Sequence, residues 1–384
     1  MLYPADAHER LTDSQWDEAR ARDAIRAIVA DACATYDPEA FWPAHEWDGY
    51  QATLPMKNVY CGAAGVAWAL DALRRRGHAE PSLDPAVVAR AALELFRREP
   101  DFMTEEAKLP QRHSSLLVGE VGIVFTLWRL APSDELADDL YALVHANVGN
   151  VSNELMWGVP GTLLAARALL AATGDDRWRE AVSESEVDLR AGRDEDGLWT
   201  QELFGRHSKI IGPVHGLIGN VLALEEPGNL ADVLRRTAVV EGEHANWPPS
   251  VDSNDSLRLQ WCHGAPGVLI HAAEHLDEDL LLAGAQLVWD AGPLGDEKGF
   301  GICHGTAGNG YALLRTFERT GDERWLERAR AFAVHALEQA ERMPPRYTLF
   351  TGGVGTALFV ADCIDGRAAF PVLEDIKDDR GENR

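Results

Sequence analysis

The sequence has no stretch of about 18 uninterrupted apolar residues, which is the length that a membrane-spanning helix needs. Its first thirty residues carry charges throughout and lack the basic start and apolar run of a secretory signal. Basic residues are few: Lys and Arg number 36 against 62 Asp and Glu, a formal charge of -26, which argues against unspecific binding to nucleic acid or to an anionic membrane. We therefore expect a cytoplasmic protein with no nucleic-acid partner and no integral membrane association.

Cysteine is also scarce, with five residues spread over 384 positions. An odd number of distant cysteines is a poor disulfide framework, so reduced thiols, either buried or bound to a metal, are the better interpretation. The five are Cys33, Cys61, Cys262, Cys303 and Cys363.

Glycine pairs of the form Gly-x-x-Gly recur seven times, at intervals of 39 to 58 residues. An apolar stretch rich in Ala and Leu follows each pair, and each interval has room for two helices and their connections. Each unit therefore reads as a helical hairpin. The pairs are Gly62/Gly65, Gly119/Gly122, Gly158/Gly161, Gly216/Gly219, Gly264/Gly267, Gly305/Gly308 and Gly352/Gly355.

Two of the units share a second motif, TGDDRWREA from Thr173 and TGDERWLERA from Thr320, each 15 residues after the first glycine of its pair. The glycine in this motif suits a positive φ at a helix end, and the aspartate suits the N-cap of the next helix. We also expect a helix N-cap at Asp84, with Pro85 in the first helical position.

These repeats predict an all-α fold, an α/α toroid or double-layered barrel of about seven helical hairpins. An inner ring of apolar helices wrapped by an outer ring buries the apolar face of every hairpin, and closure removes the exposed ends of a linear array. An open superhelix of helix pairs is the alternative. No linker rich in Pro and Gly divides the chain, so we expect a single domain over residues 1–384, with residues 1–45 as a helical lead-in.

The segments WCHGAPG and ICHGTAGN carry the strongest chemical signal. They place Cys262 and Cys303 just before a glycine pair, where the positive end of a helix favours the thiolate that binds a metal. Two thiolates and one imidazole make a set of three ligands that leaves the fourth position of a zinc ion open. His263 and His304 compete for the imidazole position. The alternative is two ordinary buried cysteines.

Other polar residues precede the glycine pairs and are expected to lie on the same face. His215, in PVHGLIGN, suits general acid/base work, although a structural histidine is the plain alternative. Glu154 is a weaker candidate, because an exposed glutamate in a connection is ordinary. Arg258 suits the neutralisation of a carboxylate or of a developing enolate, and a surface ion pair is the alternative. Cys61 is expected to lie in the core or line a pocket, since a fourth protein ligand would close the zinc to substrate.

The seven glycine pairs, WCHGAPG, ICHG and PVHG together resemble the lanthionine synthetase C family, the LanC and LanC-like proteins, over nearly the whole chain. The resemblance implies an α/α toroid with one zinc at its centre, held by Cys262, Cys303 and His304. It also implies proton transfer by His215 and an arginine near the zinc at Arg258. In lantibiotic cyclases an aspartate stands where this chain has Glu154.

The implied reaction is the addition of a thiol to dehydroalanine or dehydrobutyrine, which forms a thioether. The partners would be a dehydrated peptide, a small thiol such as glutathione, or both. A rival from another class is a non-catalytic zinc-containing protein that binds a peptide or a thiol. A toroidal glycosidase ranks last, because it would need a facing pair of acids and no acid recurs with the glycine pairs.

Overall fold

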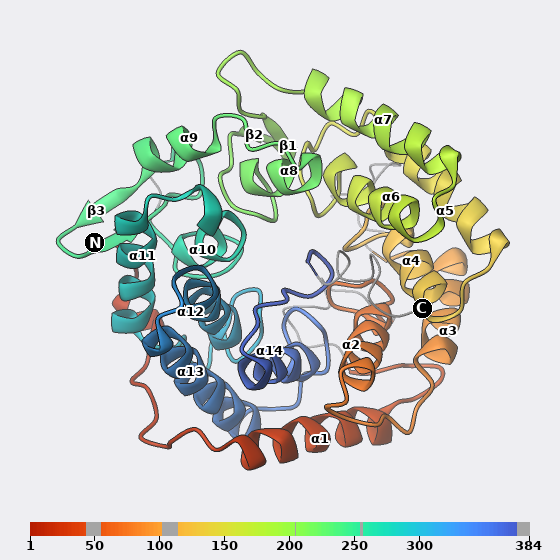
Figure 1. The fold of residues 1–384 in the computed structure, drawn as a ribbon. Coiled ribbons are helices and arrows are strands. Elements are labelled where there is room, and N and C mark those ends of the chain that lie inside the picture. The colour runs from red at the N-terminus through yellow and green to blue at the C-terminus, as the bar shows by residue number, and fades with distance from the viewer. Residues whose placement is uncertain (44–54, 102–113, 204, 254–255, 375–384) are drawn as a thin grey trace.

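A computed structural model describes residues 1–43, 55–101, 114–203, 205–253 and 256–374, and within them it has two concentric layers of α-helices (Figure 1). Seven helices form the inner ring, and each contacts the next one in this order, with α14 returning to α2. They are α2 (Ala63–Arg75), α4 (Glu120–Leu130), α6 (Val159–Thr173), α8 (Leu217–Leu224), α10 (Ala265–Ala272), α12 (Thr306–Thr320) and α14 (Gly353–Asp365).

Among the described residues, seven more helices form the outer layer: α1 (Glu18–Thr35), α3 (Pro85–Arg98), α5 (Asp134–Asn147), α7 (Asp176–Ala191), α9 (Leu230–Thr237), α11 (Glu278–Ala291) and α13 (Glu323–Arg342). Two short antiparallel hairpins interrupt it, formed by β1 (Gln201–Leu203) with β2 (Arg206–Ser208) and by β3 (Val239–Glu241) with β4 (His244–Asn246). Two 3₁₀ turns span Ala5–Ala7 and Ala273–His275. The predicted α/α toroid is confirmed, and the open superhelix is wrong.

The predicted Gly-Asp turns between inner and outer helices are present in both copies of the motif. Gly174 and Gly321 end α6 and α12 with φ of 66° and 71°. The side chains of Asp175 and Asp322 then cap α7 and α13 by accepting a backbone N–H. Asp84 caps α3 in the same way.

The first glycine of every pair is the N-cap of an inner helix, and the second lies in the first turn where neighbouring repeats touch. A Cβ on Gly65 would lie 2.0 Å from the carbonyl oxygen of Val59 and 2.9 Å from Cβ of Leu349. Leu349 belongs to the last repeat, so this glycine allows the first and last repeats to meet. The loops that precede the inner helices therefore gather at one end of the ring.

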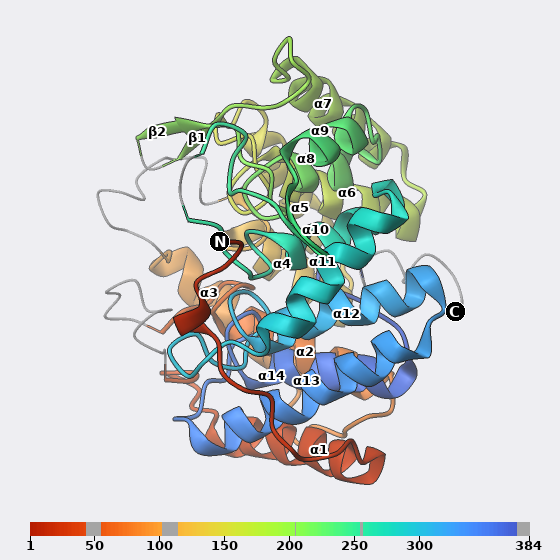
Figure 2. The ribbon, with the colours of Figure 1, turned by 90° about the vertical axis from the view of Figure 1, so that its left-hand side faces the viewer.

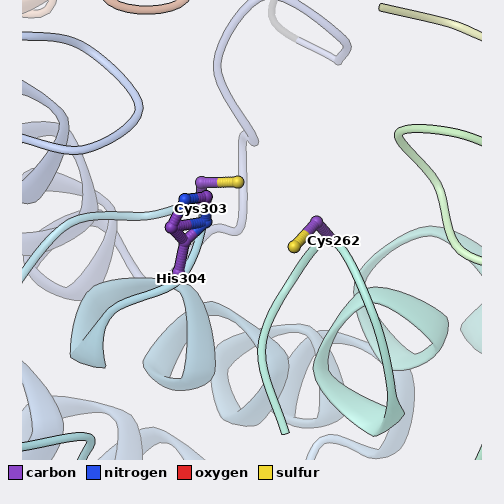
Figure 3. Close-up of side chains that lie close together, drawn as sticks. All are labelled: Cys262, Cys303 and His304. Atoms are coloured by element: carbon purple, nitrogen blue, oxygen red, sulfur yellow. The ribbon is translucent and has the colours of Figure 1, made fainter. Parts of the chain in front are cut away.

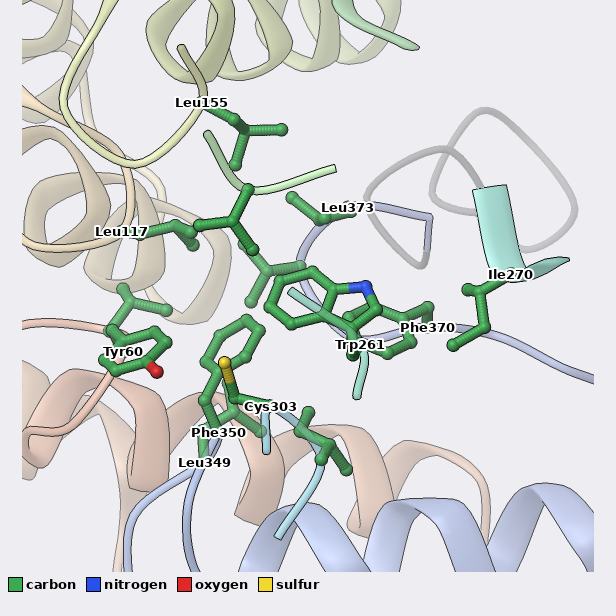
Figure 4. Close-up of a cluster of buried hydrophobic side chains, with 14 of the residues drawn as sticks. Tyr60, Leu117, Leu155, Trp261, Ile270, Cys303, Leu349, Phe350, Phe370 and Leu373 are labelled. Carbon is green, nitrogen blue, oxygen red and sulfur yellow. The ribbon is translucent and has the colours of Figure 1, made fainter. Parts of the chain in front are cut away.

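Backbone hydrogen bonds join these loops across the closure of the ring. The N–H of Phe350 donates to Tyr60 (3.2 Å), and the N–H of Cys303 donates to Phe350 (2.8 Å). Side chains from the loops meet Phe370, from the segment after α14, in a buried apolar cluster (Figure 4). The rings of Trp261 and Phe370 stack with centroids 4.7 Å apart. The middle of the ring is thus filled by side chains.

The N-terminal segment runs along the outer layer before it reaches α1 (Figure 2). Glu9 pairs there with His335 of α13, at 2.6 Å, and its backbone N–H donates to the carbonyl oxygen of Pro293.

No helix among the described residues has the length and apolar character needed to cross a membrane.

Candidate metal and catalytic site

Three of the predicted site residues meet although two loops carry them. The ligand atoms of Cys262, Cys303 and His304 all lie within 4.8 Å of one another (Figure 3). Each cysteine stands two residues before the N-cap glycine of its inner helix, α10 or α12, so contact between α10 and α12 brings the two loops together. The side chains of Cys262 and Cys303 are buried. The three residues therefore form one compact set of donors.

Of the two competing histidines, His304 is the one that joins this set. His263 instead faces His215, with ring centroids 6.3 Å apart and planes inclined by 29°. Burial lowers the pKa of His263 to about 3, and the charges of His215 and Arg258 add to the effect. His263 is thus a neutral, mostly enclosed ring beside the candidate ligands.

The pKa shifts of Cys262 and His304 suit metal binding. A hydrogen bond from Cys303 lowers the pKa of Cys262 to about 7, against the effect of burial, and Nε2 of Gln260 adds a second bond at 2.8 Å. Burial lowers the pKa of His304 to about 4, so its ring is neutral near pH 7. Its buried Nδ1 has no hydrogen-bond partner among the described residues. Two soft sulfurs and a neutral imidazole are a set of donors that fits zinc.

A buried asparagine holds the loop that carries Cys262 at both ends. Nδ2 of Asn246 donates to the carbonyl oxygens of Leu2 (2.7 Å) and Arg258 (3.0 Å), and its Oδ1 accepts the N–H of Ala265 at 2.7 Å. Gly264 has a φ of 101°, and a Cβ there would lie 2.0 Å from the Arg258 carbonyl oxygen. Residues 258–265 therefore form a tight turn that only glycine permits at its end.

Glu154 and His215 form a hydrogen-bonded pair on neighbouring loops. Oε2 of Glu154 lies 2.7 Å from Nδ1 of His215, and the carboxylate also accepts the N–H groups of Met156 (3.0 Å) and Trp157 (2.6 Å). Burial alone would lower the pKa of His215, but the hydrogen bond and charge of Glu154 outweigh it and raise that pKa. Glu154 has no exposed surface, so its interpretation as an exposed glutamate is wrong.

Three cationic side chains act electrostatically on the candidate metal ligands, although the protein as a whole is acidic. Arg258 is exposed, and its charge helps to lower the pKa values of Cys262 and His304. Lys298 and Arg346 act on His304 in the same way. Sequence reasoning missed Lys298, although its position five residues before Cys303 was a usable signal. Arg346 comes from a segment that is distant in sequence, and no motif there indicated a role at the site.

Cys61 lies outside the group of three donors. Its side chain is buried, and its sulfur accepts a hydrogen bond from Nδ2 of Asn58 at 3.7 Å. All five cysteines are free, in line with the reduced state expected from their number.

Comparison with known proteins gives the chain a family. A family model described as lanthionine synthetase C-like protein matches residues 88–374. The chain is 33% identical over 199 residues to glutathione S-transferase LANCL1 of Danio rerio, an alignment that covers 46% of this chain and 47% of that protein. It is 30% identical over 135 residues to LanC-like protein GCL1 of Arabidopsis thaliana, covering 31% of this chain and 30% of that one. The chain thus spans less than half the length of these curated relatives.

A solved structure, that of nisin cyclase, shares the fold. It superposes with a TM-score of 0.58 over 95% of this chain and 99% of its own, at 14% sequence identity. The match of the family model to most of the sequence, together with this common toroid, shows that the chain belongs to the lanthionine synthetase C-like family.

Proposed function

We propose that the chain is a zinc-dependent enzyme that adds a thiol to dehydroalanine or dehydrobutyrine to form a thioether. The observation that carries the proposal is the group of Cys262, Cys303 and His304 beside a hydrogen-bonded pair of Glu154 and His215. Membership of the family supports it, as do the names of two similar proteins, a glutathione S-transferase and a cyclase. A cytoplasmic location, where thiols stay reduced, is part of the proposal.

Cys262, Cys303 and His304 would hold one Zn²⁺ per chain. When bound, the ion supplies a Lewis acid that lowers the pKa of a substrate thiol, so that a thiolate is available near neutral pH. With three protein donors, such an ion would have room for that thiol as a fourth ligand.

His215 is the proton donor in the proposed reaction. Glu154 occupies Nδ1, so Nε2 is the nitrogen that holds the transferable proton, and the raised pKa keeps the ring protonated nearer to neutral pH. As the thiolate sulfur bonds to the β-carbon, the carbon–carbon π bond opens and the α-carbon takes the proton from His215. The proton released by the thiol restores the imidazolium, so the reaction needs no oxidant or reductant. The exposed cation of Arg258 stabilises the enolate that develops.

The positive charges around the site favour a substrate that carries carboxylates, either a small thiol or a peptide. Arg258, Lys298 and Arg346 all act on His304, whereas the chain as a whole carries a formal charge of -26. Local cations in an acidic protein attract carboxylates to the site. Glutathione, which has two carboxylates, fits this pattern, and so does a dehydrated peptide that carries acidic residues.

The test is an assay of glutathione addition to a dehydroalanine peptide, combined with metal analysis. We expect about one zinc per chain in the wild type and far less in Cys303→Ala, because one of three protein ligands is lost. His215→Ala should keep zinc and fold but lose turnover. His335→Ala, which breaks a similar histidine–glutamate pair in the outer layer, is the matched control and should keep its activity.

Full thiol addition by His215→Ala would contradict the proposed role of that histidine. Zinc and peptide binding without turnover in the wild type would identify a binding protein that lacks the chemistry.

A further inference from the structure

Three inner helices each donate a side-chain hydrogen bond to the loop that precedes the neighbouring inner helix. Asn220 of α8 donates from Nδ2 to the carbonyl oxygen of Asn153 at 2.9 Å. Asn309 of α12 donates from Nδ2 to the carbonyl oxygen of Leu259 at 3.1 Å. Thr356 of α14 donates from Oγ1 to the carbonyl oxygen of Phe300 at 2.9 Å, and a longer contact of 3.3 Å joins the same hydroxyl to the carbonyl oxygen of Gly352, the N-cap of its own helix. All three donor side chains are fully buried.

Donors and acceptors keep the same register in all three cases. Each donor stands four residues after the N-cap glycine of its own helix. Each acceptor stands five residues before the N-cap glycine of the preceding inner helix: Asn153 before Gly158, Leu259 before Gly264 and Phe300 before Gly305. A fixed register shows that the contact is a feature of the repeat, which we call the loop clamp.

The loop clamp holds the loops that carry Glu154, Cys262 and the Cys303–His304 pair. At the same helical position α2, α4 and α10 have apolar Val66, Ile123 and Val268. In α6 the position is Thr162, whose hydroxyl donates to Val159 within its own helix at 3.1 Å. Among the described residues, the side chain at this position in these four helices donates no such bond to the neighbouring loop. The clamp therefore coincides with the loops that bear the candidate metal ligands and the partner of His215.

A buried amide at these positions is not the most stabilising choice. Oδ1 of Asn220 and Oδ1 of Asn309 have no hydrogen-bond partner among the described residues. A buried polar atom without a partner costs free energy that an apolar side chain avoids, and valine or isoleucine fills the position in three other repeats. The asparagines are thus better explained by the carbonyl groups that they hold than by packing.

We infer that Asn220, Asn309 and Thr356 are positioning residues that fix the loops of the proposed metal site. Asn309 has the central place among the three. It lies on α12, directly after the loop that carries Cys303 and His304, and it donates to Leu259, three residues before Cys262. It sets the separation between the two halves of the metal site. The consequence for metal affinity rests on the proposed function, whereas the consequence for the loops does not.

The test compares variants that remove the bond with variants that keep it. Asn309→Leu and Thr356→Val retain the approximate shape of the side chain without its donor, whereas Thr356→Ser retains the hydroxyl. Val66→Ala is the matched control, because it truncates a buried side chain at the same register in a repeat without candidate ligands. Each protein is loaded with Co²⁺, whose sulfur-to-metal absorption bands report on the cysteine ligands, and its zinc affinity is measured by competition with a chelator.

We expect Asn309→Leu to bind zinc about 10–100-fold more weakly, as when a group that orients a metal ligand is lost, and to shift the cobalt spectrum. Thr356→Val should change both readouts in the same direction, and Thr356→Ser should restore them. Val66→Ala should melt at a lower temperature with an unchanged spectrum. Wild-type affinity and spectrum in both Asn309→Leu and Thr356→Val, or an equal change in Val66→Ala, would overturn the inference.

Hydrogen exchange of residues 258–263 in the metal-free proteins separates this inference from the proposed function. Asn309→Leu should speed the exchange of these backbone amides about tenfold or more, and Val66→Ala should not. A wild type that binds no metal would refute the metal site, yet the exchange data would still decide whether Asn309 holds the loop. Equal exchange in Asn309→Leu and the wild type would refute the clamp itself.

Discussion

Replacing Glu154 with glutamine tests the pair that it forms with His215. Glutamine has nearly the same shape but only one acceptor oxygen, whereas the carboxylate now accepts three hydrogen bonds. The arrangement that loses least keeps this oxygen on His215 and Met156 and leaves the N–H of Trp157 without an acceptor. The negative charge beside His215 disappears in every arrangement.

The magnitude follows from these contacts. One buried N–H without a partner costs about 1–3 kcal/mol. With an unfolding entropy of about 2.1 cal/mol/K per residue, this corresponds to a decrease of roughly 1–4 °C in the Tm of a chain of 384 residues. Activity should fall much further, by about 100-fold or more, because His215 loses the partner that orients it and keeps it protonated, and a positioned acid contributes roughly 10²–10⁴ to the rate. A variant that is nearly as stable but far less active is therefore expected.

The pH dependence gives the sharper signature. Glu154 raises the pKa of His215, so the protonated ring persists to higher pH in the wild type. In Glu154→Gln burial acts without that opposition, and the alkaline limb of the rate profile should move to lower pH. The raised pKa of His215 also makes the wild type more stable than Glu154→Gln. A histidine whose pKa is raised in the folded state stabilises the fold most at pH values below its unfolded pKa of about 6.5. The difference should therefore be largest at low pH and shrink as pH rises through the raised pKa.

The assay is kcat against pH for glutathione addition to a dehydroalanine peptide, with Tm measured at each pH. Glu9→Gln is the control, because Glu9 also pairs with a buried histidine, His335, but in the outer layer. It should change Tm without moving the rate profile. A wild-type profile in Glu154→Gln, or the same displacement in Glu9→Gln, would refute the reasoning.

Three further predictions concern the ring and the metal. Arg76→Ala strips the guanidinium from the fully buried carboxyl of Asp362, whose pKa burial raises to about 7, and should cost about 3–5 kcal/mol in urea denaturation. An equal loss in Arg74→Ala, at a half-exposed ion pair, would contradict this. Gly65→Ala would place a Cβ 2.0 Å from a carbonyl oxygen and should destabilise by at least about 1–3 kcal/mol; an unchanged Tm would disprove the close approach. Chelation should lower the Tm of the wild type, with recovery on adding zinc, but leave Cys303→Ala unaffected; an equal fall in both would contradict metal binding at this site.

The fold was open to sequence reasoning because its signals are local. A glycine that must serve as an N-cap, or a Gly-Asp turn such as Gly174 and Asp175, depends on a few neighbouring residues and recurs in each repeat. The interval between glycine pairs then fixes two helices per unit. Ring closure followed from the number of repeats and from the need to bury their apolar faces. That the chain forms a single domain stays a prediction.

The site was open to sequence reasoning only in part. WCHGAPG and ICHGTAGN look alike, but Gly264 has a φ of 101° and Gly305 one of -114°, so the backbone takes different paths beside the two histidines. No rule of spacing separates His263 from His304 on that basis. Glu154 is buried, and its partner His215 lies 61 residues away in the sequence. Asn246 reaches the Cys262 loop from β4, and its role had no sequence signal at all.

Closure of the ring also governs how such a chain can fold. Arg76 and Asp362 are 286 positions apart, and their contact joins the end of the first inner helix, α2, to the last, α14. An open array of helix pairs can start folding in any unit and survive the loss of a terminal one. In this ring the last hairpin must pack against the first. Because that contact is distant in sequence, we expect folding to be slow and strongly cooperative. Circular permutation at an outer connection should preserve the contacts between the helices, whereas deletion of one hairpin would alter the curvature that all the others share.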